Sequence, residues 1–242
     1  MKYERILEEA KKYNGYIAGI DAHIVNKWEE SFAVGYTHES TAIEGNTLSL
    51  METKVVLEDG IAIGGKQLRE IYEVINHHKA YLFIQKKIAE QLPLSEATVK
   101  DIHCILMENI FQGGFYRNVN VRITGASHFP PDPEVAYRAI QNFFVDMPLR
   151  SKEDPITFAA WTHAEFVRIH PFIDGNGRTC RLMMNYQLLS HKLLPVSIPK
   201  TARLEYFKYL EEYALTGKIE PFADYLALLE EKRLDDALKN FE

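Results

Sequence analysis

The chain has 242 residues and a formal net charge of −6 at pH 7, and 46% of its residues are hydrophobic. This length suffices for one domain with a large buried core, or for a core with a small extension. The acidic balance argues against nucleic-acid binding, which needs a basic face. The sequence contains no recognisable secretory leader and no apolar run long enough to span a bilayer. We therefore expect a cytoplasmic protein that does not bind membranes.

The spacing of apolar residues predicts helices along most of the chain, and therefore an all-α fold. We expect one or two helices within residues 1–28, followed by the segment STAIEGN at 40–46. Ser95 has the character of a helix N-cap. Further helices are predicted over residues 68–90, 95–110, 133–147, 155–170, 178–191, 203–215 and 221–238.

The segment 114–131 departs from the helical pattern. Val119, Val121 and Ile123 alternate with polar residues, which predicts a short β-hairpin closed by Gly125 and the following prolines. A lone hairpin in a helical protein has an unpaired edge, which favours pairing with another strand.

The loop HPFIDGNGRTCR, residues 170–181, gathers several chemical groups. Pro171 ends the preceding helix, so His170 lies at a helix end, where a neutral imidazole can act as a general base. Asp174 is the acid of the segment and suits a Mg²⁺ ion that bridges phosphates. Gly175 and Gly177 can adopt left-handed backbone conformations and form an anion nest.

The helix that follows this loop adds positive charge. Its free N–H groups and positive dipole end point at the same place as the glycine turn. Arg178 and Arg181 are three residues apart and share one face of its first turns. The loop is therefore expected to bind a metal-bound polyphosphate, although the Gly-Lys-Ser/Thr ending of a P-loop is missing.

HPFIDGNGRTCR resembles in full the signature HPFx(D/E)GNGRxxR of Fic domains, most of which transfer AMP from ATP to a protein hydroxyl. The resemblance implies a Fic-type helical bundle with a hairpin flap over the active site. It makes His170 the catalytic base, Phe172 a buried anchor of the loop and Asp174 the Mg²⁺ ligand. The remaining nucleotide-binding positions that it implies are Gly175, Asn176, Gly177, Arg178, Arg181 and Tyr206.

Residues 40–46 are similar to the inhibitory motif (S/T)xxxE(G/N) of autoinhibited Fic proteins that carry this motif ahead of the core. In this reading Glu44 neutralises Arg181 and occupies the γ-phosphate position, while Ser40 and Gly45 serve as helix-end residues. The segment 114–131 likewise resembles the Fic flap. Its edge is expected to align a target protein as an added strand through Val119, Val121, Ile123 and Gly125.

We expect an N-terminal helical region (1–93), a Fic core (94–214) and a C-terminal helical cap (215–242). The predicted function is an ATP- and Mg²⁺-dependent protein adenylyltransferase acting on Ser, Thr or Tyr of a target and on itself. Two alternatives stay open: a Glu44-dependent enzyme that removes AMP, and a non-catalytic nucleotide sensor that binds peptides. The target protein, the strictness for ATP and the formation of a homo-oligomer also stay open.

Overall fold

The computed structural model describes residues 2–123 and 127–241, and the described residues contain α-helices and one short 3-10 helix, without a strand. The predicted all-α class is therefore confirmed for this part of the chain. The elements in chain order are α1 (Glu4–Ile17), α2 (Ala22–Ile43), α3 (Leu50–Glu58), α4 (Leu68–Ala89), α5 (Glu96–Leu106), α6 (Pro133–Arg150), α7 (Pro155–Ile169), α8 (Asn176–Ser190), η1 (Lys200–Ala202), α9 (Arg203–Thr216) and α10 (Glu220–Phe241).

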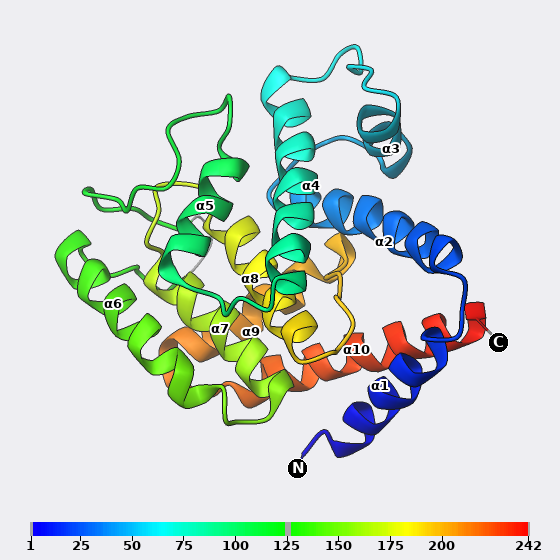
Figure 1. Ribbon diagram of the computed structural model, residues 1–242. Coiled ribbons are helices and arrows are strands. Elements are labelled where there is room, and N and C mark those ends of the chain that lie inside the picture. Colours follow the sequence, from blue (N-terminus) through cyan, green and yellow to red (C-terminus); the bar gives the residue numbers. More distant parts are fainter. Residues whose placement is uncertain (1, 124–126, 242) are drawn as a thin grey trace.

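Helix α8 lies at the centre of the bundle, packed against α7 and bordered by α4, α5 and α2 (Figure 1). It is buried on nearly all sides, which is the usual state of a helix in the core of a larger domain. Its buried Asn185 is satisfied inside the protein: the side chain donates to the Val196 carbonyl and accepts from the Val196 amide, both at 2.9 Å. This central position fixes the N-terminal end of α8, where the signature loop enters it.

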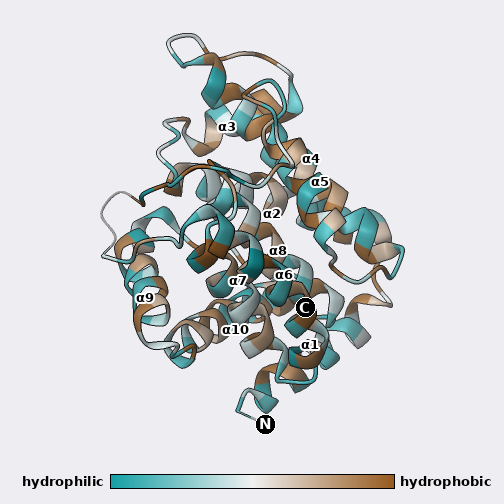
Figure 2. Ribbon diagram, turned by 90° about the vertical axis from the view of Figure 1, so that its left-hand side faces the viewer, coloured by the Kyte–Doolittle hydropathy of each residue, from teal (hydrophilic) through white to brown (hydrophobic). Residues whose placement is uncertain are grey.

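The outer helices are amphipathic, with hydrophobic and hydrophilic residues alternating along their ribbons (Figure 2). Helix α10 packs on α7, α9 and α1, so the C-terminal segment closes one side of the bundle. Helix α3, which the sequence pattern did not predict, rests on α2 and α4 over a small separate core of Leu48, Val56, Ile71 and Val74. No helix among the described residues is both long and apolar enough to cross a membrane.

The predicted β-hairpin is not present in the described part of segment 114–131, which has no strand; Gly125 lies outside the described residues. The Arg117 side chain holds this flap instead. Its Nη1 donates to the Val119 carbonyl at 2.9 Å, and its Nη2 donates to the Pro131 carbonyl. One guanidinium thus supplies the donors that a strand ladder would have provided. An isolated two-stranded hairpin is at best marginally stable, so the alternating pattern alone does not form a sheet.

Candidate active site

His170 ends α7 in the left-handed conformation, with φ 52° and ψ 58°. A non-glycine residue rarely adopts this backbone, and Pro171 excludes continuation of the helix. The His170 Nδ1 lies 3.2 Å from the Val167 carbonyl, which can only accept, so Nδ1 carries the proton and Nε2 is left as an acceptor. Burial lowers the pKa of His170 to about 4, and the imidazole is therefore neutral at neutral pH. This is the state that a general base requires.

The loop between the two helices is held from within. Phe172 is fully buried, as predicted, and its ring stacks on His103 with a centroid distance of 3.7 Å. The Asn176 side chain accepts from the Phe172 amide and donates to the Phe172 carbonyl, both at 2.9 Å. The Asn176 side chain therefore shapes the loop, and only its backbone amide is available to a phosphate.

His103 is a site residue that the sequence reasoning missed. Its Nε2 lies 3.0 Å from the Asp174 carbonyl, and its Nδ1 accepts from the Gly114 amide at 2.8 Å. It thus joins the signature loop to the start of the flap. A signal was present: His103 falls on the buried stripe of α5 with Val99, Ile102 and Leu106.

The glycine turn and the start of α8 form the expected cradle for anions. Gly175 has φ 76°, in the left-handed region, and caps α8. The first helical bond of α8 runs from the Thr179 amide to the Gly175 carbonyl. The amides of Asn176, Gly177 and Arg178 precede that bond and have no partner within the helix. Together with the helix dipole, they favour a bound phosphate.

Arg178 is 2% exposed, and its Nε and Nη1 have no hydrogen-bond partner among the described residues. The Nη1 lies 3.4 Å from Glu73 Oε1, and the Nη2 lies 3.4 Å from Asp174 Oδ1. A buried guanidinium with free donors is costly unless a ligand completes its hydrogen bonds. Arg178 is therefore suited to an anionic ligand.

Arg181 is 1% exposed and is held by the end of α2. Its Nη2 donates to Glu44 Oε1 at 2.7 Å and to the Ser40 carbonyl at 2.8 Å, while its Nε donates to the Ser40 hydroxyl at 2.9 Å. Burial lowers the pKa of Arg181, but Glu44 and Tyr206 more than offset this and raise it above its ordinary value. Arg181 thus remains a cation whose charge is already neutralised.

The structure corrects our interpretation of Ser40. We expected a helix-end residue, but α2 continues to Ile43, and the Ser40 hydroxyl binds Arg181 directly. Gly45 does follow the helix end, with φ 106°. The Glu44 carboxylate also lies on the backbone of Gly177, where a side chain would collide with its Oε1. Glu44 therefore occupies space above the anion cradle as well as the charge of Arg181.

A cavity of about 150 Å³ lies over these groups, lined by residues that include Glu44, His170, Gly177, Arg181 and Tyr206. Phe207, Leu210, Glu211 and Ala214 of α9 form the wall opposite the loop, and Ile123 comes from the flap. An apolar wall beside an anion cradle fits the base of a nucleotide. Of the other flap residues, Val119 is 51% exposed and Val121 is half-buried, so both are accessible from outside.

Tyr206 lines the cavity but is itself 1% exposed. Its hydroxyl lies 2.8 Å from His163 Nε2 and accepts from Arg181 Nη1 at 3.5 Å. Burial keeps the pKa of His163 well below its ordinary value, so this histidine is neutral. Tyr206 and His163 thus support Arg181 from behind.

Asp174 is the carboxylate that can hold a divalent cation at this site. Its side chain is 39% exposed, and its Oδ1 accepts from the Gly175 amide. Among the described residues, no group of three or more His, Cys, Asp or Glu side chains could bind a metal alone. Mg²⁺ is usually bound by one or two carboxylates together with substrate phosphates, and Asp174 beside the cradle fits this pattern.

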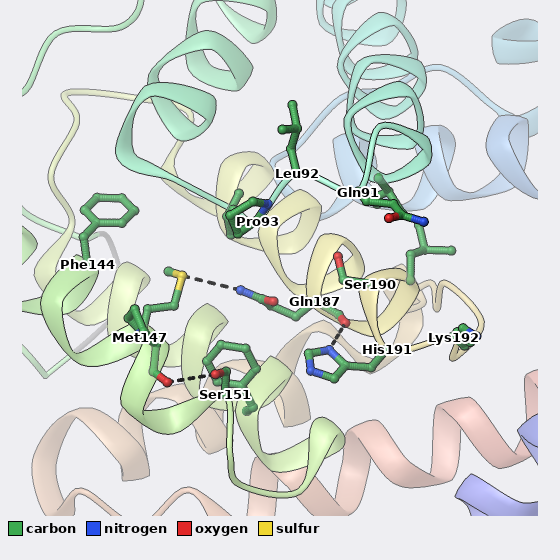
Figure 3. Close-up of a pocket in the computed structure, with 15 residues that line it drawn as sticks. Gln91, Leu92, Pro93, Phe144, Met147, Ser151, Gln187, Ser190, His191 and Lys192 are labelled. Atoms are coloured by element: carbon green, nitrogen blue, oxygen red, sulfur yellow. Dashed lines mark hydrogen bonds between the residues drawn. The ribbon is translucent and has the colours of Figure 1, made fainter.

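A different cavity, of about 640 Å³, lies at the C-terminal end of α8, far from the signature loop (Figure 3). There the Gln187 amide donates to the Met147 sulfur at 3.6 Å, and His191 Nδ1 bonds the Gln187 carbonyl at 2.7 Å. None of the described residues that line it is a carboxylate, and its walls are largely apolar. It offers no acid–base pair, whereas the cavity at the N-terminal end of α8 joins His170, Glu44 and Arg181, so we take that end as the candidate active site.

Comparison with known proteins agrees with this geometry. Residues 93–188 match the model of the Fic/DOC family. The chain is 34% identical over 204 residues to "Protein adenylyltransferase Fic" of Drosophila persimilis, and 34% identical over 204 residues to that of Drosophila grimshawi. These alignments cover 83% of this chain but 40% and 42% of the relatives, so the chain spans about two fifths of their length.

Solved structures extend the likeness to nearly the whole chain. Fic-1 of C. elegans (residues 134–508) superposes with a TM-score of 0.86 and 27% identity, over 98% of this chain and 72% of that one. A Fic domain-containing signaling protein of Bacteroides thetaiotaomicron gives a TM-score of 0.88 at 21% identity, over 100% and 97% of the two chains, and shows the fold alone. The chain belongs to the Fic/DOC family.

Proposed function

We propose that this protein is an autoinhibited protein adenylyltransferase, which transfers AMP from ATP to a Ser, Thr or Tyr hydroxyl of a target protein and of itself. The observation that carries the proposal is the position of Arg181. It lies at the anion cradle beneath His170, and Glu44 and Ser40 of α2 take up its donors. The relatives named adenylyltransferases support the reaction class.

In the proposed reaction the target hydroxyl oxygen attacks the α-phosphorus of ATP. An O–P bond forms, the bond to the β-phosphate oxygen breaks, and pyrophosphate leaves. His170 Nε2 accepts the hydroxyl proton, which its free acceptor position and its neutral state allow. Most of the rate enhancement comes from positioning and charge neutralisation, as in other phosphoryl-transfer reactions.

The α8 amides and Arg178 would hold the α- and β-phosphates, and Arg181 would meet the γ-phosphate. Mg²⁺, when bound by Asp174 and the phosphates, would supply neutralisation of the phosphate charge. The base would lie in the cavity against α9, beside Tyr206 and Phe207. Many Fic proteins have an asparagine on this helix that faces the base, and residues 212–216 of this chain have none, so the choice of base stays open.

The target would dock along the flap, adding its backbone to the edge near Val119 and Val121 as an extra strand. The exposure of Val119 supports this arrangement, and the strand that we predicted from the sequence would form on pairing.

Inhibition follows from charge and volume. Glu44 pairs with Arg181 and lies above Gly177. The γ-phosphate would therefore find the Arg181 guanidinium already paired and the space above the cradle filled. Couplings of this kind are typically worth ~1–3 kcal/mol, or roughly 5- to 150-fold in binding. Glu44 faces the same cavity as His170, which also favours the alternative that it orients a water molecule to remove AMP from a modified protein.

The test is transfer from ATP labelled at the α-phosphate, with Mg²⁺, by wild type, Glu44→Gly, and Glu44→Gly combined with His170→Ala. We expect faint self-labelling in wild type, strong labelling in Glu44→Gly and none in the double variant. Glu30→Gly removes an exposed glutamate of the same helix and should behave like wild type.

Labelling that does not depend on His170 would contradict the proposed base. Nucleotide binding without transfer in any variant would favour the peptide-binding sensor. Loss of label from a modified protein only when Glu44 is intact would favour AMP removal.

A further inference from the structure

Four charged side chains close a ring at the anion cradle, two from α4 and two from the signature segment. Arg69 Nη2 binds Asp174 Oδ2, and Arg69 Nε lies 3.1 Å from Glu73 Oε1. The same Glu73 oxygen lies 3.4 Å from Arg178 Nη1, and Arg178 Nη2 lies 3.4 Å from Asp174 Oδ1. Two acids alternate with two arginines, so the ring is neutral as it stands.

This ring uses both carboxylate oxygens of Asp174. Oδ1 accepts from the Gly175 amide and faces Arg178, while Oδ2 is bound by Arg69. A hard divalent cation binds directly to carboxylate oxygen. The guanidinium on Oδ2 therefore takes the place that such a cation would need.

The ring is also fastened to the turn that follows Glu44. Asn46 Nδ2 donates to Glu73 Oε2 at 3.1 Å and to the Glu70 carbonyl at 2.9 Å. The Asn46 amide in turn donates to the Thr41 carbonyl at 3.2 Å. The end of α2 and the start of α4 thus form one unit that covers the cradle from the N-terminal side.

We propose that Arg69 is a built-in competitor of the divalent cation for Asp174, a second brake that acts beside Glu44. The proposal rests on the proposed function, because it assumes a cation–nucleotide complex in this cradle. Glu44 covers the arginine expected at the γ-phosphate, and Arg69 covers the expected metal ligand. The Arg69 side chain is 52% exposed and that of Asp174 is 39% exposed, so the pair can open to solvent without unfolding the bundle.

The experiment measures nucleotide affinity by calorimetry, with an ATP analogue whose α,β-bridge is a methylene group and cannot be cleaved. Each variant is titrated with the analogue once in the presence of Mg²⁺ and once in the presence of EDTA. The ratio of the two dissociation constants of the analogue gives the gain in affinity due to the cation. In the Glu44→Gly background, we expect Arg69→Gln to raise this gain about fivefold or more, within the usual range of coupling between sites.

Two variants serve as controls in the same background. Arg69→Lys keeps a cation able to pair with Asp174, so its gain should stay closer to that of Glu44→Gly alone. Lys79→Gln removes a charge from the same helix, where Lys79 pairs with Glu108 at 2.9 Å and does not touch the ring. It should leave the gain unchanged. Melting curves check that each variant is folded. We expect nearly unchanged melting temperatures, because loss of an exposed ion pair costs little stability.

An unchanged gain in Arg69→Gln overturns the inference. The inference is also overturned if, in EDTA, Arg69→Gln binds the analogue more weakly than Glu44→Gly alone, because Arg69 would then be a phosphate ligand. If Glu44→Gly transfers AMP while Arg69→Gln leaves the gain unchanged, only the inference fails. If Glu44→Gly binds no nucleotide, the proposed function fails and the inference falls with it.

Discussion

His170 combines an unusual backbone with an unusual environment. Its backbone is left-handed at the end of α7, its side chain lines the cavity, and the Val167 carbonyl fixes which nitrogen carries the proton. Strain of this kind persists only when the surroundings compensate for it. Here Arg117 Nε donates to the His170 carbonyl at 2.8 Å, and the Arg117 amide donates to the Pro171 carbonyl at 2.9 Å. The base is therefore held by the start of the flap as well as by its own helix.

The low pKa of His170 predicts that the rate of AMP transfer does not fall in mildly acidic solution. A base must be unprotonated, so transfer by Glu44→Gly should fall only as the pH falls through about 4. A histidine with its ordinary pKa would already lose half the rate near 6.5. We expect the initial rate of labelling to be flat from pH 8 to about pH 6.

Circular dichroism at each pH separates this titration from unfolding. A rate that is half-maximal near pH 6.5 in a folded protein would contradict the predicted burial effect.

The start of the flap is held by one side chain, while its later residues Ser127 and His128 contact α9 and α7. Arg117 is 5% exposed and donates to the carbonyls of Val119 and Pro131 in the flap and of His170 in the signature loop. The flap is thus tied to the signature loop at its base. The alternating pattern predicted a β-hairpin, which the described residues of this segment do not form; Arg117 binds its carbonyls instead.

Replacing Arg117 should free the flap. We expect Arg117→Met to speed trypsin cleavage after Arg122, an exposed residue, by about tenfold or more, which corresponds to about 1.4 kcal/mol of lost local stability. Transfer to a target should fall, because the flap no longer presents an ordered edge. Mass spectrometry of timed digests gives the cleavage rate.

Arg138→Met, an exposed arginine on α6, is the control and should cleave like wild type. Equal cleavage after Arg122 in both variants would show that other contacts hold the flap.

Helix α10 joins the C-terminal segment to the loop after α8 through Glu230. Glu230 is fully buried, and its Oε1 accepts from the Leu194 amide at 2.7 Å, while Oε2 has no hydrogen-bond partner among the described residues. Burial raises the pKa of Glu230 to about 8. The fold therefore takes up a proton here that the unfolded chain releases at much lower pH.

This raised pKa predicts a loss of stability toward alkaline pH. The contribution of Glu230 is fully present below its unfolded pKa of 4.5 and is lost as the pH rises through about 8. Glu230→Gln should remove this dependence. The difference in the free energy of unfolding between variant and wild type should grow by about 1.4 kcal/mol per pH unit from pH 5 to pH 8.

Urea denaturation at pH 5, 6.5, 8 and 9 measures it. Glu231→Gln changes the neighbouring glutamate, which pairs with Arg5 at 2.9 Å outside the core, and should follow wild type. Parallel pH curves for wild type and Glu230→Gln would refute the prediction.

Features that depend on neighbours along the chain could be predicted from the sequence alone. Pro171 ends α7 and Gly175 opens α8, so the base, the cradle and the spacing of Arg178 and Arg181 follow from local backbone preferences. The burial of Phe172 follows from the family resemblance. The motif at 40–46 likewise predicted that Glu44 pairs with Arg181. This contact was expected from the resemblance to a known family, since residue spacing alone cannot predict a contact between distant segments.

Contacts between segments that lie far apart in the chain became visible only in the folded protein. Ser40 binds Arg181 across 141 positions, and Arg69 binds Asp174 across 105. Neither residue differs locally from an ordinary helical serine or arginine, so nothing in its neighbourhood predicts a partner. The flap is a further example, because a β-strand needs a second strand to pair with. In the folded protein Arg117 binds carbonyls of the flap, and the described residues form no such pair.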